Sequence, residues 1–187
     1  GALSSLGRIK AKNCRPFLED FLARPSHNDI GRSAIFRALA NLEEEQAWAT
    51  LLEGADYGAA RGSRFSAIQG LAKLAGRFEH LKPEAINTLK RFARETRGTP
   101  SATFRGKLAA IQAMGELEDL SAIPTLRKLA EGETDGRLKR RAEETIVRLF
   151  ESAKKPAEMK LIRSDLDDLL KENKSLRDRV DTMEKQK

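Results

Sequence analysis

The stretch AIQAMGEL, residues 110–117, occurs almost twice, because AIQGLAKL stands at residues 67–74. In both copies the first Ala is followed by apolar residues four and seven positions later. That spacing places three side chains on one face of a helix, which turns once in about 3.6 residues. The return of one helix face after about forty residues predicts a repeated structural unit.

Two weaker copies of the same face begin at Ile35 and Ala142. The twelve apolar positions of the four copies are Ile35, Leu39, Leu42, Ala67, Leu71, Leu74, Ala110, Met114, Leu117, Ala142, Ile146 and Leu149. Another apolar-periodic segment precedes each copy, so the sequence predicts four pairs of helices. Aromatic residues make up only 5% of the chain and β-branched residues are scarce, which favours the all-α class. The unequal spacing of the copies is typical of an irregular α-solenoid of about four helix pairs.

Small residues stand at or beside this face in the second helices, at Ala38, Gly70 and Ala113. We expect neighbouring helices to approach closely at these positions. Gln112 lies off the apolar stripe and is expected to face outward.

The segment RGKLAAIQAMGELEDLSAIPTLRKLAEGETDGRLKRRAEETIVRL, residues 105–149, resembles consecutive HEAT-type repeats. The resemblance extends loosely over residues 14–151. It implies a Pro early in a first helix, matched by Pro124, and an Asp in the turn that meets a cation of the second helix. The matching residues are Asp29 with Arg32, Asp56 with Arg61 or Arg64, and Asp135 with Arg137 or Arg141. Glu143 departs from the pattern, because it stands where Ile68 and Ile111 stand in the other copies.

Two segments, residues 54–74 and 122–144, are also similar to the C-terminal helical-repeat part of prokaryotic M1-family zinc aminopeptidases. This resemblance implies a non-catalytic domain that arches over a catalytic domain and restricts substrate entry. It also implies that zinc belongs to an upstream catalytic domain, with no cofactor in the present chain. Such a catalytic domain would be an intramolecular partner.

The sequence KKP at residues 154–156 interrupts the repeats, and a different pattern follows. We therefore divide the chain into an extension or linker (1–13), a HEAT-like α-solenoid (14–153) and a C-terminal coiled-coil helix (154–187). Apolar residues of the last segment alternate at spacings of three and four, as in a heptad repeat that begins at Met159. The residues predicted to form the contact are Ile162, Leu166, Leu169, Asn173, Leu176, Val180 and Met183.

Asn173 occupies an a position of the heptad, where a single Asn favours a two-stranded coil in fixed register. The flanking residues support a parallel homodimer, because three of the four interchain pairs are attractive. These are Glu158 with Arg163, Glu172 with Arg177 and Arg179 with Glu184, while Asp165 with Leu170 is neutral. The alternative is a surface helix that folds back on the solenoid, with Leu170 widening its apolar face.

The residues that carry most enzyme chemistry are few. The two histidines, His27 and His80, fall in connecting segments and lack the helical spacing of a zinc-binding pair. Cys14 is the only cysteine. Cations such as Arg15 and Lys12 can lower the pKa of a thiol, but no His or second Cys is close in the sequence, so we expect Cys14 to be an ordinary residue at a helix start. We expect this chain to be non-catalytic, without a metal site.

The formal net charge is +7, and cations gather at the starts of the second helices. This basic ridge consists of Arg61, Arg64, Arg105, Lys107, Arg137, Lys139, Arg140 and Arg141. It could bind nucleic-acid phosphates, an acidic peptide or the carboxyl end of a peptide substrate. Alternatively, it could be a solvated face with structural Asp–Arg pairs. Aromatic residues do not alternate with these cations, which disfavours nucleic acid.

Three function classes remain: a protein-interaction scaffold that dimerises through its tail, the accessory domain of an aminopeptidase, and a nucleic-acid-binding protein. The apolar runs are too short for a membrane span, and no signal-peptide pattern is present. We therefore expect a cytoplasmic protein that has protein partners and no membrane contact.

Overall fold

The computed structural model describes residues 2–11, 13–24, 27–56, 58–59 and 61–154, together with residues 166, 169 and 173. Throughout these ranges the regular structure is helical and no strand is present, so the predicted all-α class is confirmed. The chain divides into two compact units, Gly1–Leu149 and Phe150–Lys187.

The first unit is a succession of helices joined by short connections. They are α1 (Ala2–Arg8), α2 (Arg15–Leu22), α3 (Ile30–Leu42), α4 (Ala47–Ala55), α5 (Arg61–Arg77), α6 (Lys82–Ala93), α7 (Pro100–Glu116) and α8 (Ile123–Gly132). Short 3-10 helices are η1 (His27–Asp29), η2 (Glu79–Leu81) and η3 (Leu120–Ala122). A further helix begins at residue 136 and reaches the end of the first unit, while residues 150–154 of the second unit are also helical.

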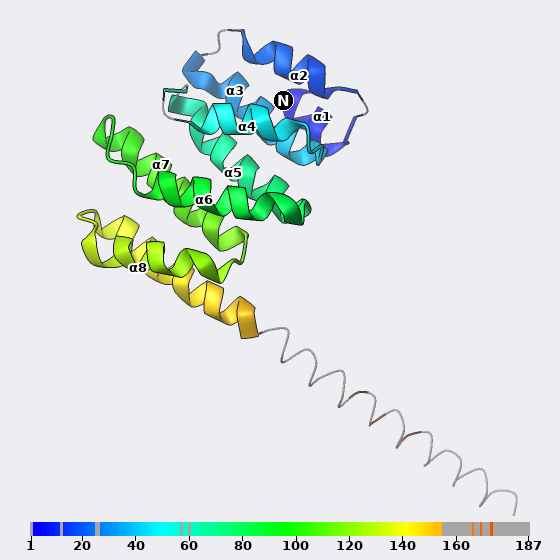
Figure 1. The fold of residues 1–187 in the computed structure, drawn as a ribbon. Helices are drawn as coiled ribbons and strands as arrows, with labels where there is room; N and C mark the ends of the chain where they lie inside the picture. Colours follow the sequence, from blue (N-terminus) through cyan, green and yellow to red (C-terminus); the bar gives the residue numbers. More distant parts are fainter. Residues whose placement is uncertain are drawn as a thin grey trace, which may run out of the picture. The chain divides into compact units, whose positions relative to one another are not determined.

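The helices of the first unit pack in a solenoid-like order. α3 contacts α5, and α5 contacts α7, while α2, α4 and α6 pack respectively on α3, α5 and α7. In Figure 1, α4, α6 and α8 follow one another down the front of the unit. Each helix therefore buries its apolar face against neighbours that lie close to it in the sequence.

The core lies between these helices and contains the repeated face. Of the twelve predicted positions, all are buried except Ile146, which is half-buried. Leu39, Leu71 and Met114, the central residues of three copies, are fully buried. Glu143 is exposed, in contrast to Ile68 and Ile111.

Close helix approach explains the small residues of the second helices. A Cβ added at Gly70 would lie 2.7 Å from Leu51 Cδ2 and 3.3 Å from Ala40 Cβ. A Cβ added at Gly7 of α1 would lie 2.5 Å from Ala38 Cα, so the backbones of α1 and α3 meet at Ala38. The expected close contacts at Ala38 and Gly70 are thus present.

The first residues differ from their expected role as an extension or linker. Ala2–Arg8 is a helix that packs against α3, and Leu3 and Leu6 lie against the core. Lys10 Nζ also donates to Glu43 Oε2 over 2.7 Å. The helix is only seven residues long, so its apolar spacing is too short to stand out in the sequence.

One structural unit occurs twice in succession. In the first occurrence α5 is followed by η2 and α6, and in the second α7 is followed by η3 and α8. The helix after each 3-10 helix has a Pro in its first turn, Pro83 in α6 and Pro124 in α8. A Pro is well tolerated there because the first N–H groups of a helix have no partner within it.

Candidate interaction surface

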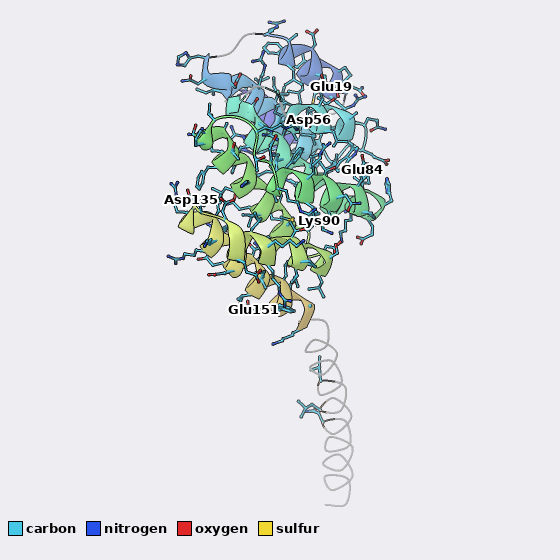
Figure 2. The ribbon with its side chains drawn as sticks, turned by 60° about the vertical axis from the view of Figure 1, so that its left-hand side comes forward. Glu19, Asp56, Glu84, Lys90, Asp135 and Glu151 are labelled. Carbon is cyan, nitrogen blue, oxygen red and sulfur yellow. The ribbon has the colours of Figure 1, made fainter. Side chains whose placement is uncertain are left out.

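Polar side chains join successive helix pairs on the side of the first helices. Trp48 Nε1 of α4 donates to Glu84 Oε2 at the start of α6, over 3.0 Å. Lys90 Nζ, farther along α6, donates to Ser121 Oγ of η3 over 3.2 Å, and Figure 2 labels Glu84 and Lys90 on this helix. These bonds connect the second helix pair to the third and the third to the fourth.

Two of the three predicted Asp–Arg pairs are present. Arg32 Nη1 lies 2.7 Å from Asp29 Oδ1, and Arg137 Nη2 lies 2.7 Å from Asp135 Oδ2. The Arg137 guanidinium, assisted by backbone N–H groups, lowers the pKa of Asp135 to about 2. In return, Asp135 raises the pKa of Arg137.

The predicted pairing of Asp56 with Arg64 is wrong. Asp56 Oδ1 lies 3.5 Å from Arg91 Nη2 of α6. Arg64 instead pairs with Glu95, whose Oε2 lies 2.6 Å from its Nη2. Both ion pairs connect to the following helix pair rather than within the adjacent turn. The side chain of Arg61, the other predicted partner of Asp56, lies outside the described residues.

Most of the predicted basic ridge is engaged in ion pairs within the chain. Its paired members are Arg64 with Glu95, Lys107 with Glu133, Arg137 with Asp135, and both Arg140 and Arg141 with Glu144. Arg105 is exposed and Lys139 is half-buried. The ridge is therefore not a uniform row of free cations within the described chain.

Arg64 and Lys107 occupy equivalent places three residues before the first apolar position of their helices. Lys107 Nζ lies 2.5 Å from Glu133 Oε2, and these side chains are 12% and 13% exposed. Lys107 lowers the pKa of Glu133. Glu95 and Glu133 follow α6 and α8, so each cation links a second helix to the end of the next first helix.

Three pockets follow one another along the loops that join first and second helices. The first, of about 1000 Å³, and the middle, of about 200 Å³, share Gly58 and Ala59, while the middle and the third, of about 350 Å³, share Gly98. Gly58 and Gly98 have φ angles of 97° and 103°, which other residues rarely adopt.

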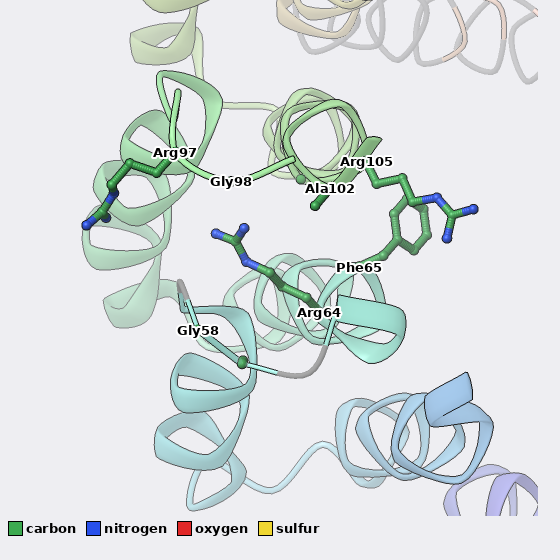
Figure 3. A pocket seen from close by; sticks show the side chains of 9 residues that line it. Gly58, Arg64, Phe65, Arg97, Gly98, Ala102 and Arg105 are labelled. Atoms are coloured by element: carbon green, nitrogen blue, oxygen red, sulfur yellow. The ribbon is translucent and has the colours of Figure 1, made fainter. Parts of the chain in front are cut away.

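The middle pocket differs from its neighbours in charge. The described charged residues that line it are Arg64, Arg97 and Arg105. Figure 3 shows Arg64 pointing into the space between the Gly58 and Gly98 loops, with the Arg97 and Arg105 guanidinium groups directed outward on either side. Sequence reasoning missed Arg97, because it lies in a loop rather than at a second-helix start.

The second helices present another pocket of about 350 Å³. Gln69 of α5 and Gln112 of α7 line it together with Arg148 of the last helix. Gln112 is half-buried, so it reaches the surface as expected but does not point freely into solvent.

Three of the predicted coiled-coil residues are described. Leu166, Leu169 and Asn173 are helical, and the two leucines are 54% and 62% exposed. The remaining predicted contact residues, Ile162, Leu176, Val180 and Met183, lie outside the described residues. The pairing of this segment therefore stays a prediction.

The histidines and the cysteine occupy separate parts of the first unit. His80 Nε2 lies 3.0 Å from Glu45 Oε1 in an exposed pair, and His27 lies beside Asn28. Cys14 precedes α2, and burial raises the pKa of its thiol, with a further contribution from the Glu44 carboxylate. Cys14 is thus the residue before a helix, as expected, and its pKa does not move in the direction that a neighbouring cation would favour.

Two features are absent from the described residues. They contain no group of three or more His, Cys, Asp or Glu side chains placed to hold a metal ion. Over the same part of the chain, no helix combines the length and the apolar character that crossing a membrane requires.

Comparison with known proteins adds one match. Residues 107–132 match the PBS lyase HEAT-like repeat. The matched segment contains most of α7, η3 and α8. The chain thus contains a HEAT-like repeat, which confirms part of the resemblance inferred from sequence. No curated protein and no solved structure matches the chain.

Proposed function

We propose that this chain is a non-catalytic scaffold of four HEAT-like helix pairs that binds another protein. The observation that carries the proposal is the repeat match over α7, η3 and α8, because α5, η2 and α6 have the same succession of elements. Stacked helix pairs bury one another and leave extended faces for a partner.

The face of the second helices is the proposed partner surface. Gln69 and Gln112 occupy corresponding positions of α5 and α7 and line one pocket. The charged residues that also line it, Glu116, Arg141, Glu144 and Arg148, are two of each sign, so the described lining carries no net charge. The two amide side chains both donate and accept hydrogen bonds. This surface therefore suits a protein partner better than a polyanion.

Photo-cross-linking tests the scaffold proposal. A benzophenone amino acid at Gln112 should capture a partner protein from extract, whereas the same group at Arg127, exposed on α8, should not. The captured protein, once purified, should bind the intact chain in calorimetry and lose affinity for a Gln69→Arg, Gln112→Arg variant. Equal capture from both positions, or unchanged affinity of the variant, contradicts the proposed surface.

The scaffold is further proposed to be a homodimer joined by the C-terminal segment. Leu166 and Leu169 are exposed apolar residues of the heptad pattern, and a short helix of this kind needs a partner to be stable. A Leu166→Asp, Leu169→Asp variant should be monomeric in sedimentation equilibrium. Leu120→Asp, at a leucine that is 45% exposed in the first unit, should remain a dimer. A monomeric wild-type chain contradicts the dimer and leaves the scaffold proposal intact.

A finer proposal assigns the chain to the C-terminal domain of an M1-family zinc aminopeptidase, where it would shape substrate access or assembly. It rests on the resemblance of residues 54–74 and 122–144 alone. An upstream coding sequence with a zinc-binding His/Glu/His motif would support it, and an upstream sequence without one overturns it.

The alternative, nucleic-acid binding through the basic ridge, has less support. Of the seven ridge cations whose side chains the structure describes, five have a carboxylate partner. Phosphate binding would have to compete with these carboxylates. A gel shift at low salt is the test, and absence of a shift excludes this alternative.

A further inference from the structure

We propose that the last helix of the first unit binds one helix of a partner protein, whose charges complement Lys139 and Glu143. The surface consists of Lys139, Glu143 and Val147, which we call the end stripe. These residues are four positions apart, so they lie on one face of the helix. In Figure 1 the succession of helices in this unit ends with α8 and the last helix. The end stripe is separate from the proposed face of the second helices and does not depend on it.

Val147 occupies a position that is covered in the earlier copies. It stands five residues after the first apolar position of its copy, as Ala40, Ala72 and Gly115 do in theirs. Those three residues are buried. For Ala40 the cover is the next second helix, because a Cβ added at Gly70 would lie 3.3 Å from Ala40 Cβ. Val147 is 56% exposed, so this face of the last helix can still accept a helix.

Lys139 occupies a position that binds a carboxylate in two earlier copies. Arg64 and Lys107 also stand three residues before the first apolar position, and they pair with Glu95 and Glu133 over 2.6 and 2.5 Å. Each carboxylate follows the first helix of the next pair, so that helix ends near the start of the preceding second helix. Lys139 is half-buried, and its ammonium group has no partner among the described residues. An antiparallel helix that ends in a Glu would supply one.

Glu143 excludes a further repeat of the same kind as the occupant. Ile68 and Ile111 hold this position in α5 and α7 and are fully buried. Glu143 is exposed, and within the described chain its carboxylate has no ion-pair partner. An apolar helix face laid over it would bury an unpaired charge, which is costly. The occupant therefore carries a Lys or Arg opposite Glu143, about one helical turn before its terminal Glu.

Two copies of the end stripe do not complement each other. In a parallel pair each charged residue would face its own equivalent, so like charges would meet. In an antiparallel pair centred on Glu143, the two Glu143 carboxylates would meet. If the centre moves to the midpoint of Lys139 and Glu143, these two residues pair but Val147 faces Asp135. A different protein with its own order of charges therefore fits better than a second copy.

The end stripe thus defines the partner helix by three residues. Toward its C-terminal end the partner helix carries an apolar residue for Val147, a cation for Glu143 and a carboxylate for Lys139, about four positions apart. The apolar contact removes Val147 from water. The two charged contacts select the partner and fix its direction, because a helix that runs the other way would bring like charges together.

Two synthetic helices of equal composition test the site. The first is an alanine-rich peptide of about 20 residues that carries Leu, Lys and Glu four positions apart, in that order toward its C-terminal end. The control peptide exchanges the Lys and the Glu. A Glu four residues before a Lys stabilises an isolated helix better than the reverse order. Tighter binding of the first peptide therefore cannot result from higher helix content.

Methyl resonances of valine report the binding to the full chain, because Val147 and Val180 are its two valines. The first peptide should shift the Val147 signals saturably and leave the Val180 signals unchanged. It should bind about five- to tenfold more tightly than the control peptide, since two attractive charge pairs replace two repulsive ones. A Val147→Asp variant identifies the signals and should weaken the binding of both peptides.

Reciprocal exchange of the charges separates this site from diffuse attraction. Lys139→Glu with Glu143→Lys should reverse the preference, so that the control peptide binds more tightly. Arg140→Glu with Glu144→Lys makes the same exchange in an ion pair of the same helix and should leave the preference unchanged. Urea unfolding checks that both variants keep the fold.

Several results overturn the proposal: equal binding of the two peptides, a preference that the exchange at Lys139 and Glu143 does not reverse, or a reversal by the control exchange. Val147 signals that move with chain concentration would make a second copy the occupant instead. Val147 signals that move in the Leu166→Asp, Leu169→Asp variant would assign the end stripe to the C-terminal segment of this chain. Cross-linking at Gln112 is measured independently, so failure at the end stripe leaves the scaffold proposal standing.

Discussion

Arg64 Nη2 lies 2.6 Å from Glu95 Oε2, and the two side chains are only 11% and 7% exposed. This ion pair joins α5 to the residue that follows the C-cap of α6, so it connects two successive helix pairs. Arg64 also caps the C-terminal end of α4, because its Nε donates to the carbonyl of Ala55, the last residue of that helix. One side chain thus holds three helices in place.

Loss of the acidic partner should destabilise the first unit. Glu95→Gln should lower the free energy of unfolding by about 2 kcal/mol, less than for a fully buried pair because the pocket admits water to Arg64. Glu131→Gln, at an exposed residue of α8, should change it by less than about 0.5 kcal/mol. Urea unfolding of both variants measures the difference, and equal midpoints would show that the pair does not contribute.

Two glycines of α5 should respond in opposite directions to the same substitution. Gly70→Ala brings a Cβ to within 2.7 Å of buried Leu51 and should cost about 1–3 kcal/mol. Gly76 has open space around its Cβ position, so Gly76→Ala should stabilise the helix by about 0.5 kcal/mol. Thermal and urea unfolding measure both, and destabilisation by both variants would contradict the close approach at Gly70.

The Asp135–Arg137 pair predicts a pH dependence at low pH. The pKa of Asp135 is about 2 in the folded chain, below its ordinary value of 3.8. Since the folded pKa is the lower one, the pair stabilises the fold above pH 3.8, and this contribution disappears as pH falls from 3.8 to about 2. Carbon-detected titration of the Asp135 carboxyl should therefore have its midpoint near pH 2.

The Arg137→Gln variant is the control for that titration. Arg137 is the main cause of the low pKa, so its removal should raise the midpoint toward the ordinary value. The stability difference between Asp135→Asn and the wild-type chain should also fade as the pH approaches 2. An unchanged midpoint in the Arg137→Gln variant would assign the shift to the backbone N–H groups instead.

Asn173 should control the number of chains in the predicted coil. Asn173→Ile replaces a polar residue at an a position with an apolar one. The variant should associate more strongly but with less preference for the dimer over higher oligomers. Sedimentation equilibrium should then detect trimers or larger species beside dimers. A variant that associates exactly as the wild-type chain does would mean that Asn173 is not in the contact.

The buried helix faces could be predicted from sequence because burial within a helix depends on local spacing. Ile35 and Leu39, for example, both lie on the face that the spacing selects, and both are buried. α1 was not predicted, because its seven residues span too few helical turns for an apolar periodicity to be recognised. The burial of Leu3 and Leu6 against the core depends on the tertiary position of α3, which no local pattern contains.

The polar contacts were less predictable than the core. Asp29 is the N-cap residue of α3 and Arg32 lies in the first turn of that helix, three residues later, so their pairing is a local contact. Arg64 and Glu95 are 31 residues apart, and their contact depends on how one helix pair is stacked on the next. The same holds for Arg97, which joins the middle pocket because its loop lies beside the loop of Gly58.

The succession α5–η2–α6, followed by α7–η3–α8, has a consequence for how such a chain changes in evolution. Each such repeat of two helices packs mainly on the repeats directly before and after it. Gaining or losing one repeat therefore leaves the remaining contacts in place. The length of the molecule can therefore vary by whole repeats. In a single-core domain of the same size, the same insertion or deletion would require the core to repack.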